Sequence, residues 1–417
     1  MRKHIDRLSD EGVQVDSNGE LHVALPTDET QVQTVLARAA EDDLAVIPTG
    51  RSSKLAWCRP ETLANAARDN TLLLSTRRLD AILDHVPGDG TITAQVGCSM
   101  EQLGEEVASG GHALSPAVAG ARRATLGGVL GAGLSGCDRL RHGPVRHHVL
   151  GMRIALADGT LAKSGGKLVK NVTGFDLHRL YTGSRGTLCV MLEASLRLLP
   201  APELQRVLTT SSSERAPLFE AVAALRSLPI GPLALTLENT RRDGWRLHLA
   251  MAGMAARVER EHELACGVLP PVEVHDDAAA RSALAQLVEL ELDDGAWPHA
   301  RVLTTPSRCA AALDVLNGNA DVPAPRLVVQ PAVASIGLHV EGLSTDPPAA
   351  QTSVLRALAT RLHDVGARLE PMAVSPETHL ALAPDPGRQP ALRWMQGLAD
   401  ELDPCGRFCS PTFPGRR

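Results

Sequence analysis

The first two hundred residues alternate between helical and strand patterns of apolar positions. A helix is predicted to start after Thr27 or Asp28, either of which can cap it. Its apolar side chains recur at helical spacing: Val32, Val35, Leu36 and Ala39. Short strands, apolar or alternating, are predicted at 44–47, 72–74, 91–96, 149–156 and 188–199. A second helix is predicted at about 100–108, after the third of these strands. Alternating helices and strands predict an α/β unit over residues 1–200.

The pattern changes after Pro200 and Pro202, where the polar run 209–215 indicates a domain boundary. In the strand predicted at 245–251, Leu247, Leu249 and Met251 share one side. Helices are predicted near 217–227, 276–292, 307–316 and 349–364, among further strands near 234–238, 326–330 and 335–340. This mixture predicts an α+β domain over residues 201–394, followed by a helix and a proline-rich tail.

The composition argues against several classes of protein. Aromatic residues make up only 2% of the 417 residues and the net charge is −6, which argues against a nucleic-acid-binding protein. The N-terminus lacks the apolar core of a secretory signal, and no run of about 18 apolar residues predicts a membrane span. Eight scattered cysteines without a CxxC pair predict free thiols in a cytoplasmic protein that binds no metal.

A candidate phosphate-binding loop, PTGRSSK at residues 48–54, follows a predicted strand. Its small residues allow successive backbone N–H groups to converge on one anion, and two serine hydroxyls and Lys54 add further donors. A polar turn between a strand and a helix explains the same residues equally well. The loop alone therefore leaves both interpretations open.

Glycines are concentrated in a second segment, where Gly127, Gly128, Gly131 and Gly133 follow a possible helix cap at Thr125. Each glycine inside a helix costs about 1 kcal/mol relative to alanine. A helix with this many glycines is therefore expected where a large flat or phosphorylated ligand lies against its bare main chain and fixes the backbone. Residues 131–136 also satisfy the G-x-G-x-x-G string. They lack the preceding strand and following apolar helix of a nicotinamide-binding Rossmann motif, which is therefore not favoured.

A third segment, 167–188, contains Lys170 and is punctuated by Gly174, Gly183 and Gly186. Taken alone it fits a surface loop that leads into a strand. Histidines at 142, 147 and 148 lie just before it. Adjacent histidines on a strand point to opposite sides, so structural roles are favoured over a catalytic base.

Taken together and in order, these segments resemble the FAD-binding proteins of the vanillyl-alcohol oxidase type, also called the PCMH fold. The resemblance covers about residues 25–200 and returns in the tail sequence LDPCGRFCSPTFPGR. Within the family the chain is most similar to the FAD-binding E subunit of bacterial glycolate oxidase. The resemblance implies a PCMH-type FAD domain of two α/β subdomains over 1–200. An α+β cap for substrate or subunit contacts would follow over 201–394, and a tail over 395–417 would pack back onto the FAD domain.

The resemblance also implies FAD as a non-covalent cofactor, because the first loop has no histidine to attach it. Arg51 and Ser52 stand where the family more often has glycine, and Cys409 and Ser410 stand where its tail pattern has asparagine. The implied contacts for the diphosphate are Thr49, Gly50, Arg51, Ser52, Ser53, Lys54, Thr125, Leu126, Gly127 and Gly128. The implied contacts for the ribityl chain, the ring and a closing loop are Gly131, Leu134, Ser135, Gly136, Lys170 and Gly174.

The implied activity is oxidation of a small 2-hydroxy acid such as glycolate, by hydride transfer to the flavin. The implied partners are a sister FAD subunit and an iron–sulfur subunit, which could hold the chain at a membrane that it does not itself span. Lys170 or Arg139 would lie near the flavin N1 edge, and Arg246 would bind the substrate carboxylate. Two alternatives remain: a self-sufficient dehydrogenase of another hydroxy acid, a sugar or an aldehyde, and a non-catalytic scaffold that binds flavin weakly.

Overall fold

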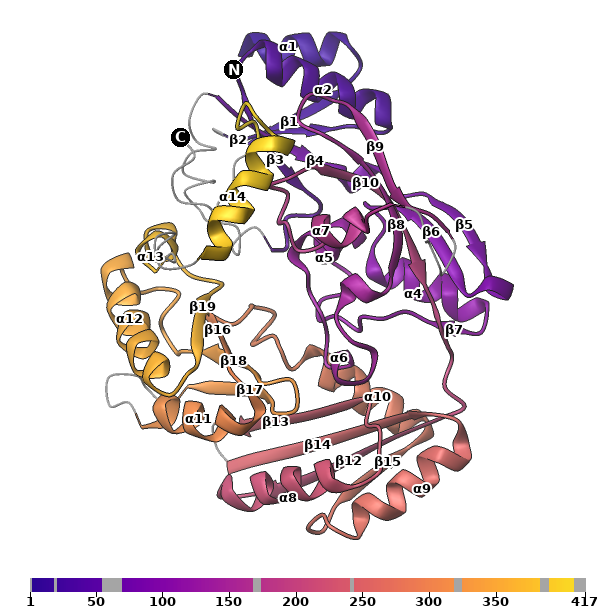
Figure 1. The fold of residues 1–417 in the computed structure, drawn as a ribbon, viewed down its shortest axis with the longest axis vertical. Helices are drawn as coiled ribbons and strands as arrows, with labels where there is room; N and C mark the ends of the chain where they lie inside the picture. The colour runs from indigo at the N-terminus through magenta and orange to yellow at the C-terminus, as the bar shows by residue number, and fades with distance from the viewer. Residues whose placement is uncertain are drawn as a thin grey trace.

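Three larger sheets, one two-stranded sheet and their covering helices make up the described part of the computed structural model (Figure 1). The structure describes residues 2–18, 21–54, 70–167, 174–240, 244–318, 325–382 and 390–408. Two smaller sheets form the first half of the chain, and one eight-stranded sheet forms the second. The predicted α/β half and α+β half therefore correspond to two different sheet architectures. No described helix has both the length and the apolar character that a bilayer crossing needs.

The first sheet has the order β1-β2-β4-β3, with β2, β4 and β3 parallel. Its strands are β1 (Gln14–Asn18), β2 (Leu21–Leu25), β3 (Ala45–Thr49) and β4 (Thr71–Ser75). Helices α1 (Arg2–Asp10) and α2 (Glu29–Glu41) pack on it. Asp28 is the residue that caps α2, since its carboxylate accepts from Gln31 N. The buried face of α2 is the predicted one: Val32, Val35, Leu36 and Ala39.

The second sheet is antiparallel, with the order β5-β6-β10-β8-β9. Its strands are β5 (Ile82–Val86), β6 (Thr91–Gln95), β8 (Val149–Ala155), β9 (Leu161–Gly165) and β10 (Val190–Arg197). A short pair joins β7 (His112–Ala113) to β11 (Leu199–Pro200). The helices of this part are α4 (Met100–Ser109), α5 (Leu126–Ala132), α6 (Arg139–His142) and α7 (Leu177–Tyr181). Met100, Leu103 and Val107 form the buried face of α4, whereas Ala108 is exposed.

The third sheet has the order β15-β12-β14-β13-β17-β18-β16-β19. Its strands are β12 (Leu204–Ser212), β13 (Ala234–Thr240), β14 (Gly244–Gly253), β15 (Glu273–Asp276), β16 (Ala300–Leu303), β17 (Arg326–Gln330), β18 (Ser335–His339) and β19 (Arg368–Pro371). Its helices are α8 (Ala216–Ser227), α9 (Ala255–Cys266), α10 (Asp277–Glu289), α11 (Cys309–Asn317), α12 (Pro348–Asp364) and α13 (Pro376–Ala381). The apolar pattern predicts four of these helices but not α9 or α13.

The two faces of the third sheet differ in chemistry. Leu247, Leu249 and Met251 point to one side, as their alternation predicts, and share a core with α8, α9, α11 and α12. The opposite face packs on α10 and on Cys137, just before α6. In Figure 1, α6 and α10 lie between this sheet and the upper part of the molecule, while α8 and α9 lie on its far side. The sheet therefore turns its second face toward the first half of the chain.

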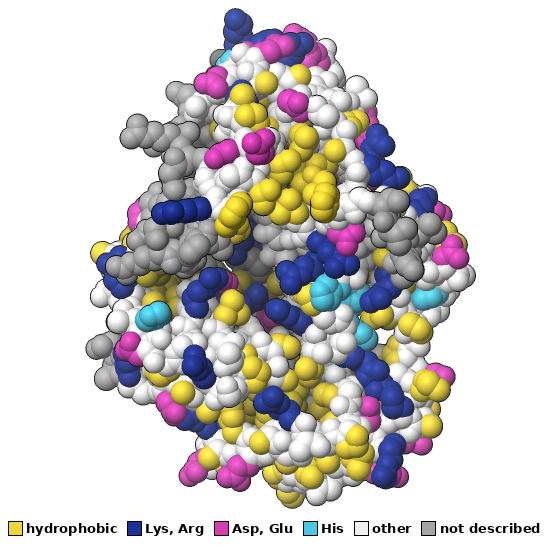
Figure 2. All heavy atoms as spheres, in the orientation of Figure 1, with side chains coloured by type: hydrophobic (Ala, Val, Ile, Leu, Met, Phe, Trp, Pro, Cys, Tyr) yellow, Lys and Arg dark blue, Asp and Glu magenta, His cyan; other side chains and the backbone are white. Residues whose placement is uncertain are grey.

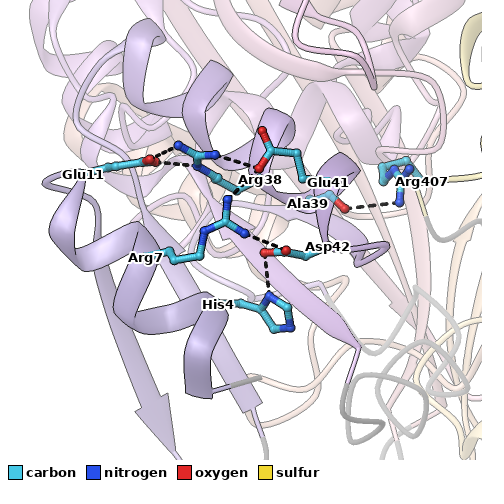
Figure 3. A network of polar contacts seen from close by, with 8 residues as sticks. All are labelled: His4, Arg7, Glu11, Arg38, Ala39, Glu41, Asp42 and Arg407. Atoms are coloured by element: carbon cyan, nitrogen blue, oxygen red, sulfur yellow. Dashed lines mark hydrogen bonds and ion pairs between the residues drawn. The ribbon is translucent and has the colours of Figure 1, made fainter.

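The C-terminal segment returns to the first sheet after α14 (Pro390–Leu402). The Phe408 side chain is fully buried, and Val46 N donates to the carbonyl of Arg407 at 2.8 Å. Arg407 Nη1 donates to the carbonyl of Ala39 at 3.2 Å, at the edge of an ionic network between α1 and α2 (Figure 3). In that network Arg38 pairs with Glu11 and Glu41, and Arg7 and His4 pair with Asp42. These contacts join residues far apart in sequence into one unit.

The histidines before the third sequence segment do not lie on a strand. Val145–His147 form a 3-10 turn, so the prediction of opposite orientations on a strand was wrong. His148 is fully buried, with Nε2 3.0 Å from the carbonyl oxygen of His142, and burial lowers its pKa. This placement is that of a structural histidine.

Candidate functional site

A cavity opens where the two predicted loops meet. The space between its walls, with the solvent at its open mouth included, is about 780 Å³. Its lining comes from the loop after β3, the start of α5, and the segment that leads into β10. The lining residues are Pro48, Thr49, Gly50, Arg51, Ser52, Ser53, Lys54, Thr76, Val96, Thr125, Gly127, Gly128, Gly131, Ala132, Arg185, Gly186, Cys189, Val190 and Met191. Ten of the sixteen residues proposed from the sequence for cofactor contacts are among them.

Hydrogen bonds from the 3-10 turn after β4 hold the first loop in place. Ser75 Oγ donates to the carbonyl of Gly50 at 2.8 Å, and Thr76 Oγ1 donates to that of Thr49 at 3.2 Å. Gly50 itself lies against Thr125, since a Cβ there would collide with Thr125 Oγ1. The two loops are therefore packed directly on each other, and only glycine fits at their contact.

The two residues that replace family glycines leave the cavity open. Arg51 lines the cavity, and its Nη1 is held by donating to the carbonyl of Arg122 at 2.9 Å. Ser52 adopts φ 59°, a left-handed conformation that favours glycine. The backbone here thus keeps a glycine-type turn although the side chains have changed.

Helix α5 presents bare main chain to the cavity. Thr125 caps it and accepts from Gly128 N at 3.1 Å, as the sequence predicts. Gly127 packs on Val96, where a Cβ would come within 3.0 Å. Gly131 faces open space, because a Cβ added there would have no other group within 4 Å. A side chain at Gly131 would therefore take up room that the cavity now offers to a ligand.

Lys54 brings a buried positive charge to this helix. Its side chain is only 8% exposed, its Nζ donates to Ser53 Oγ at 3.2 Å, and it lies 5.8 Å from the centre of the Trp297 ring. Burial, aided by the charge of Arg123, lowers the pKa of Lys54 to about 8. Among the described residues no carboxylate lies within ion-pair distance of it. A buried ammonium without a counter-ion among the described residues, beside glycine main chain, suits a phosphate group.

The remaining walls come from residues that the sequence analysis did not assign to the site. Val96, Ala132, Cys189, Val190 and Met191 supply an apolar surface. Thr76, Arg185 and Gly186 border it. Residues 185–191 belong to the segment YTGSRGTLCVM, whose glycines were noted, but nothing in the local pattern indicates that this segment, which leads into β10, hydrogen-bonds to α5.

Four of the predicted contacts lie away from the cavity. Leu126 and Leu134 point into the core beneath α5, each 1% exposed. Ser135 is also buried, and its Oγ accepts from Val145 N at 3.2 Å. Gly136 packs on the carbonyl of Ala117 so closely that a Cβ would collide with it. These residues belong to the same glycine-rich segment as the site, but they pack in the core beneath α5 and do not face the cavity.

The other candidates lie farther along the chain. Gly174 is exposed, with φ 92° and open space around it, and does not line the cavity. Lys170 lies outside the described residues. Arg246 is exposed on β14, on the side opposite Leu247 and Leu249, and does not line the cavity either. Within the described chain no cluster of three metal-ligating side chains occurs.

Comparison with known sequences matches part of the first half of the chain to a family of cofactor-binding domains. The profile of a family described as "FAD binding domain" matches residues 21–165. The glycolate oxidase subunit GlcE of Escherichia coli is 35% identical over 201 residues, which are 48% of this chain and 54% of that protein. The glycolate oxidase subunit GlcD of Bacillus subtilis is 29% identical over 45% of this chain and 38% of its own length. A D-2-hydroxyglutarate dehydrogenase of Xanthomonas citri is 30% identical over 50% and 43%. The matches thus span about half or less of these relatives.

Solved structures share the fold over the whole chain. A carbohydrate oxidase from Microdochium nivale superimposes with a TM-score of 0.71 and 15% identity, covering 98% of both chains. A chitooligosaccharide oxidase gives 0.69 and 13%, also over 98% of both. At these identities the likeness concerns the fold alone, and it agrees with the fold class predicted from the sequence. Residues 21–165 therefore match an FAD-binding domain, the fold is of the PCMH, or vanillyl-alcohol oxidase, type, and FAD is the cofactor.

Proposed function

We propose that FAD binds non-covalently in the cavity between the loop 49–54 and the start of α5, and that the chain oxidises a small 2-hydroxy acid. The observation that carries the proposal is the buried ammonium of Lys54 beside the bare main chain of α5. The diphosphate would bind Lys54, the hydroxyl groups of Ser52 and Ser53, and backbone N–H groups of both loops. Because no histidine lines the described cavity, a histidyl attachment has no support there.

The apolar wall fits the rest of such a cofactor. Val96, Val190 and Met191 offer a surface against which a flat ring can lie, and Gly131 leaves the space beside it open. A flavin held there would supply the hydride acceptor, and the acid would become a 2-oxo acid by losing a hydride from its hydroxyl-bearing carbon and the hydroxyl proton to solvent. The role of the chain is to hold the cofactor, to exclude water from it, and to orient the acid.

Sequence similarity supports the substrate class. Relatives named glycolate oxidase subunits and D-2-hydroxyglutarate dehydrogenase each match 45–50% of the chain at 29–35% identity. We further propose that the chain acts as a subunit, and that electrons leave its flavin for a sister flavoprotein and an iron–sulfur subunit. The names of the two glycolate oxidase subunits support this part of the proposal.

Two measurements test it. The purified chain, reconstituted with FAD and desalted, should retain about one flavin per chain. Anaerobic mixing with glycolate, D-lactate or D-2-hydroxyglutarate should then bleach the flavin absorbance with at least one of them. A chain that retains no flavin would contradict the cofactor site and would favour a scaffold.

The subunit role requires a separate assay. We expect low turnover with dyes for the isolated chain, and a large increase when it is co-purified with partners that carry flavin and iron. Robust dye-linked turnover by the chain alone would contradict the subunit role and favour a self-sufficient dehydrogenase. A panel of sugars and aldehydes in the same assay would separate the remaining substrate classes.

A further inference from the structure

A band of positively charged side chains lies where the two halves of the chain meet. The ten residues 139–148, RLRHGPVRHH, include three arginines and three histidines but no carboxylate. Acidic residues outnumber Lys and Arg in the whole chain, 48 to 42, so the overall composition does not explain this concentration. Figure 2 shows basic and histidine side chains gathered in this band, around the place of α6 in Figure 1. Arg139, Arg141, Arg146 and His147 are exposed there and form the basic surface.

The basic surface has a fixed shape, because short turns and hydrogen bonds hold its backbone. Gly143 N donates to the carbonyl of Arg139 at 2.9 Å and ends α6. The 3-10 turn Val145–His147 follows, and the ring of its last residue lies so close to Gly143 that a Cβ there would collide with it. Arg139 and Arg146 therefore stand on two consecutive turns. Their charges also act on each other, since partial burial and the positive charges of Arg301 and Arg146 lower the pKa of Arg139.

The arginines of the basic surface lack counter-charges among the described residues. No described carboxylate lies within ion-pair distance of any of the three. Asp138, directly before them in the sequence, is buried and turned toward another loop, where Ser115 Oγ donates to it at 2.7 Å and Ala117 N at 3.1 Å. Like charges held together without a carboxylate between them favour an anionic partner.

Contacts with both halves of the chain anchor the basic surface. Val145 N donates to Ser135 Oγ at 3.2 Å, just after α5, whose first residues line the cofactor cavity. Leu140 packs against the apolar core of the third sheet, and Arg141 donates to the carbonyl of Gly231. A protein bound to this surface therefore stands beside the cofactor domain and contacts both halves.

The arrangement suits an extended anionic surface better than a small anion. None of the four side chains lines a cavity described here, and all four lie on the outside of the molecule. Charges spread in this way steer and align a protein whose facing surface is rich in Asp and Glu. The aromatic content of 2% and the net charge of −6 argue against a nucleic acid as the partner.

We propose that Arg139, Arg141 and Arg146 form the docking surface for an acidic protein, the iron–sulfur partner of the function proposed above. Carboxylates of that partner supply the counter-charges that the chain itself does not. The identity of the partner rests on the proposed function, but the docking surface does not. Arg139, which the resemblance placed near the flavin N1 edge, does not line the cavity and belongs to this surface instead.

The test is titration of the FAD-loaded chain into a dye-labelled plant-type ferredoxin, a small acidic iron–sulfur protein, followed by fluorescence anisotropy. We expect saturable binding that weakens as NaCl is raised from about 20 to 200 mM, because salt screens exposed charges. The charge-reversed variant, Arg139→Glu with Arg146→Glu, should bind about 10- to 100-fold more weakly, since like charges then face each other.

The matched control combines Arg226→Glu on α8 with Arg361→Glu on α12, both at exposed positions. It changes the net charge by the same amount and should weaken binding by no more than about twofold, because distant exposed charges are screened. The proposal is overturned if ferredoxin does not bind, or if the charge-reversed variant and this control bind it equally.

Further variants separate charge from folding. Arg139→Lys with Arg146→Lys should bind ferredoxin as the wild type does, because it keeps the charge, and Arg139→Gln with Arg146→Gln should fall between the wild type and the charge-reversed variant. Flavin content and urea midpoint should be the same in all of them, since both side chains are exposed. Tighter binding to a DNA duplex or to phosphatidylglycerol vesicles than to ferredoxin would overturn the assignment to a protein.

The outcomes for the docking surface and for the function are distinguishable. If ferredoxin binding depends on Arg139 and Arg146 but no hydroxy acid reduces the flavin, the docking surface stands and the proposed oxidation fails. If a hydroxy acid reduces the flavin and the charge-reversed variant binds ferredoxin as tightly as the wild type, the oxidation stands and the docking surface fails.

Discussion

Trp297 donates its indole N–H to the carbonyl oxygen of Ser53, 3.3 Å away, and so connects the eight-stranded sheet to the candidate phosphate loop. The residues are 244 positions apart in the chain. The ring of Trp297 also faces the Lys54 ammonium at 5.8 Å. Two further bonds support this junction: Gly120 N donates to the Glu289 carboxylate, and Arg123 donates to the carbonyl of Gly295. The cofactor cavity is therefore positioned by both halves of the chain.

Trp297→Phe should weaken FAD binding about 2- to 10-fold, because it removes one hydrogen bond that holds the loop but keeps an aromatic ring over Lys54. Trp297→Ala should weaken it further, since the ring is lost as well. Titration of the apoprotein with FAD, followed by flavin fluorescence, measures both. Trp394→Phe, at a position 79% exposed, should have no effect. Equal affinities for wild type and Trp297→Ala would show that the junction does not support the loop.

Lys54→Met should weaken FAD binding about 10- to 100-fold, because it removes a charge-assisted bond to the diphosphate. Titration of the apoprotein with FAD measures the loss. The exposed Lys163→Met on β9 is the control and should bind FAD normally. An unchanged affinity in Lys54→Met would mean that the diphosphate lies elsewhere.

The same lysine predicts a pH dependence. In the empty protein its pKa is about 8, below the 10.5 of a free lysine side chain, so it is charged below pH 8 and neutral above. A bound diphosphate favours the charged form, so FAD binding takes up a proton above pH 8. The affinity should therefore fall as pH rises above 8, by up to about tenfold per unit. Lys54→Met should show no such fall, and an equal fall in both proteins would assign it to another group.

Gly131→Ala should change stability and cofactor binding in opposite directions. Alanine stabilises a helix by up to about 1 kcal/mol relative to glycine, and nothing in the empty protein clashes with the new methyl group. The methyl group would extend into the cavity and hinder FAD. We expect a higher urea midpoint for the apoprotein together with a weaker FAD affinity. Gly166→Ala, also in open space but outside the cavity, should leave FAD affinity unchanged.

Phe408→Ala should destabilise the protein by about 3–5 kcal/mol, since it empties a fully buried position against the first sheet. Urea unfolding measures this, with Trp394→Ala as the exposed control. The backbone N–H groups of Arg407 and Phe408 both donate to Asp403, at 2.8 Å each. A loss well below this range, about 1 kcal/mol or less, would mean that the tail contributes little to the fold.

Local patterns predicted about half of the individual elements, since each of these depends on neighbours in sequence. The apolar spacing of α2, its cap at Asp28, and the cap of α5 at Thr125 needed no knowledge of distant residues. Helix α9 was missed although its buried residues, Val258, Glu261 and Ala265, lie at helical spacing. One of the three is a glutamate, so the apolar face cannot be recognised until Arg257 is seen to pair with it.

The sequence by itself determined that small residues and a lysine occur at 49–54 and that glycines follow Thr125, two segments suited to a phosphorylated ligand, because backbone access and charge are local properties. Only the tertiary structure decided which of those residues face the cavity. Leu134 and Ser135 belong to the same glycine-rich segment yet point into the core, since the chain turns at Gly133 to pack on Gly183. The wall from residues 185–191 meets the two loops only when separate elements dock, and no local sequence pattern specifies the distance between residues remote in the chain.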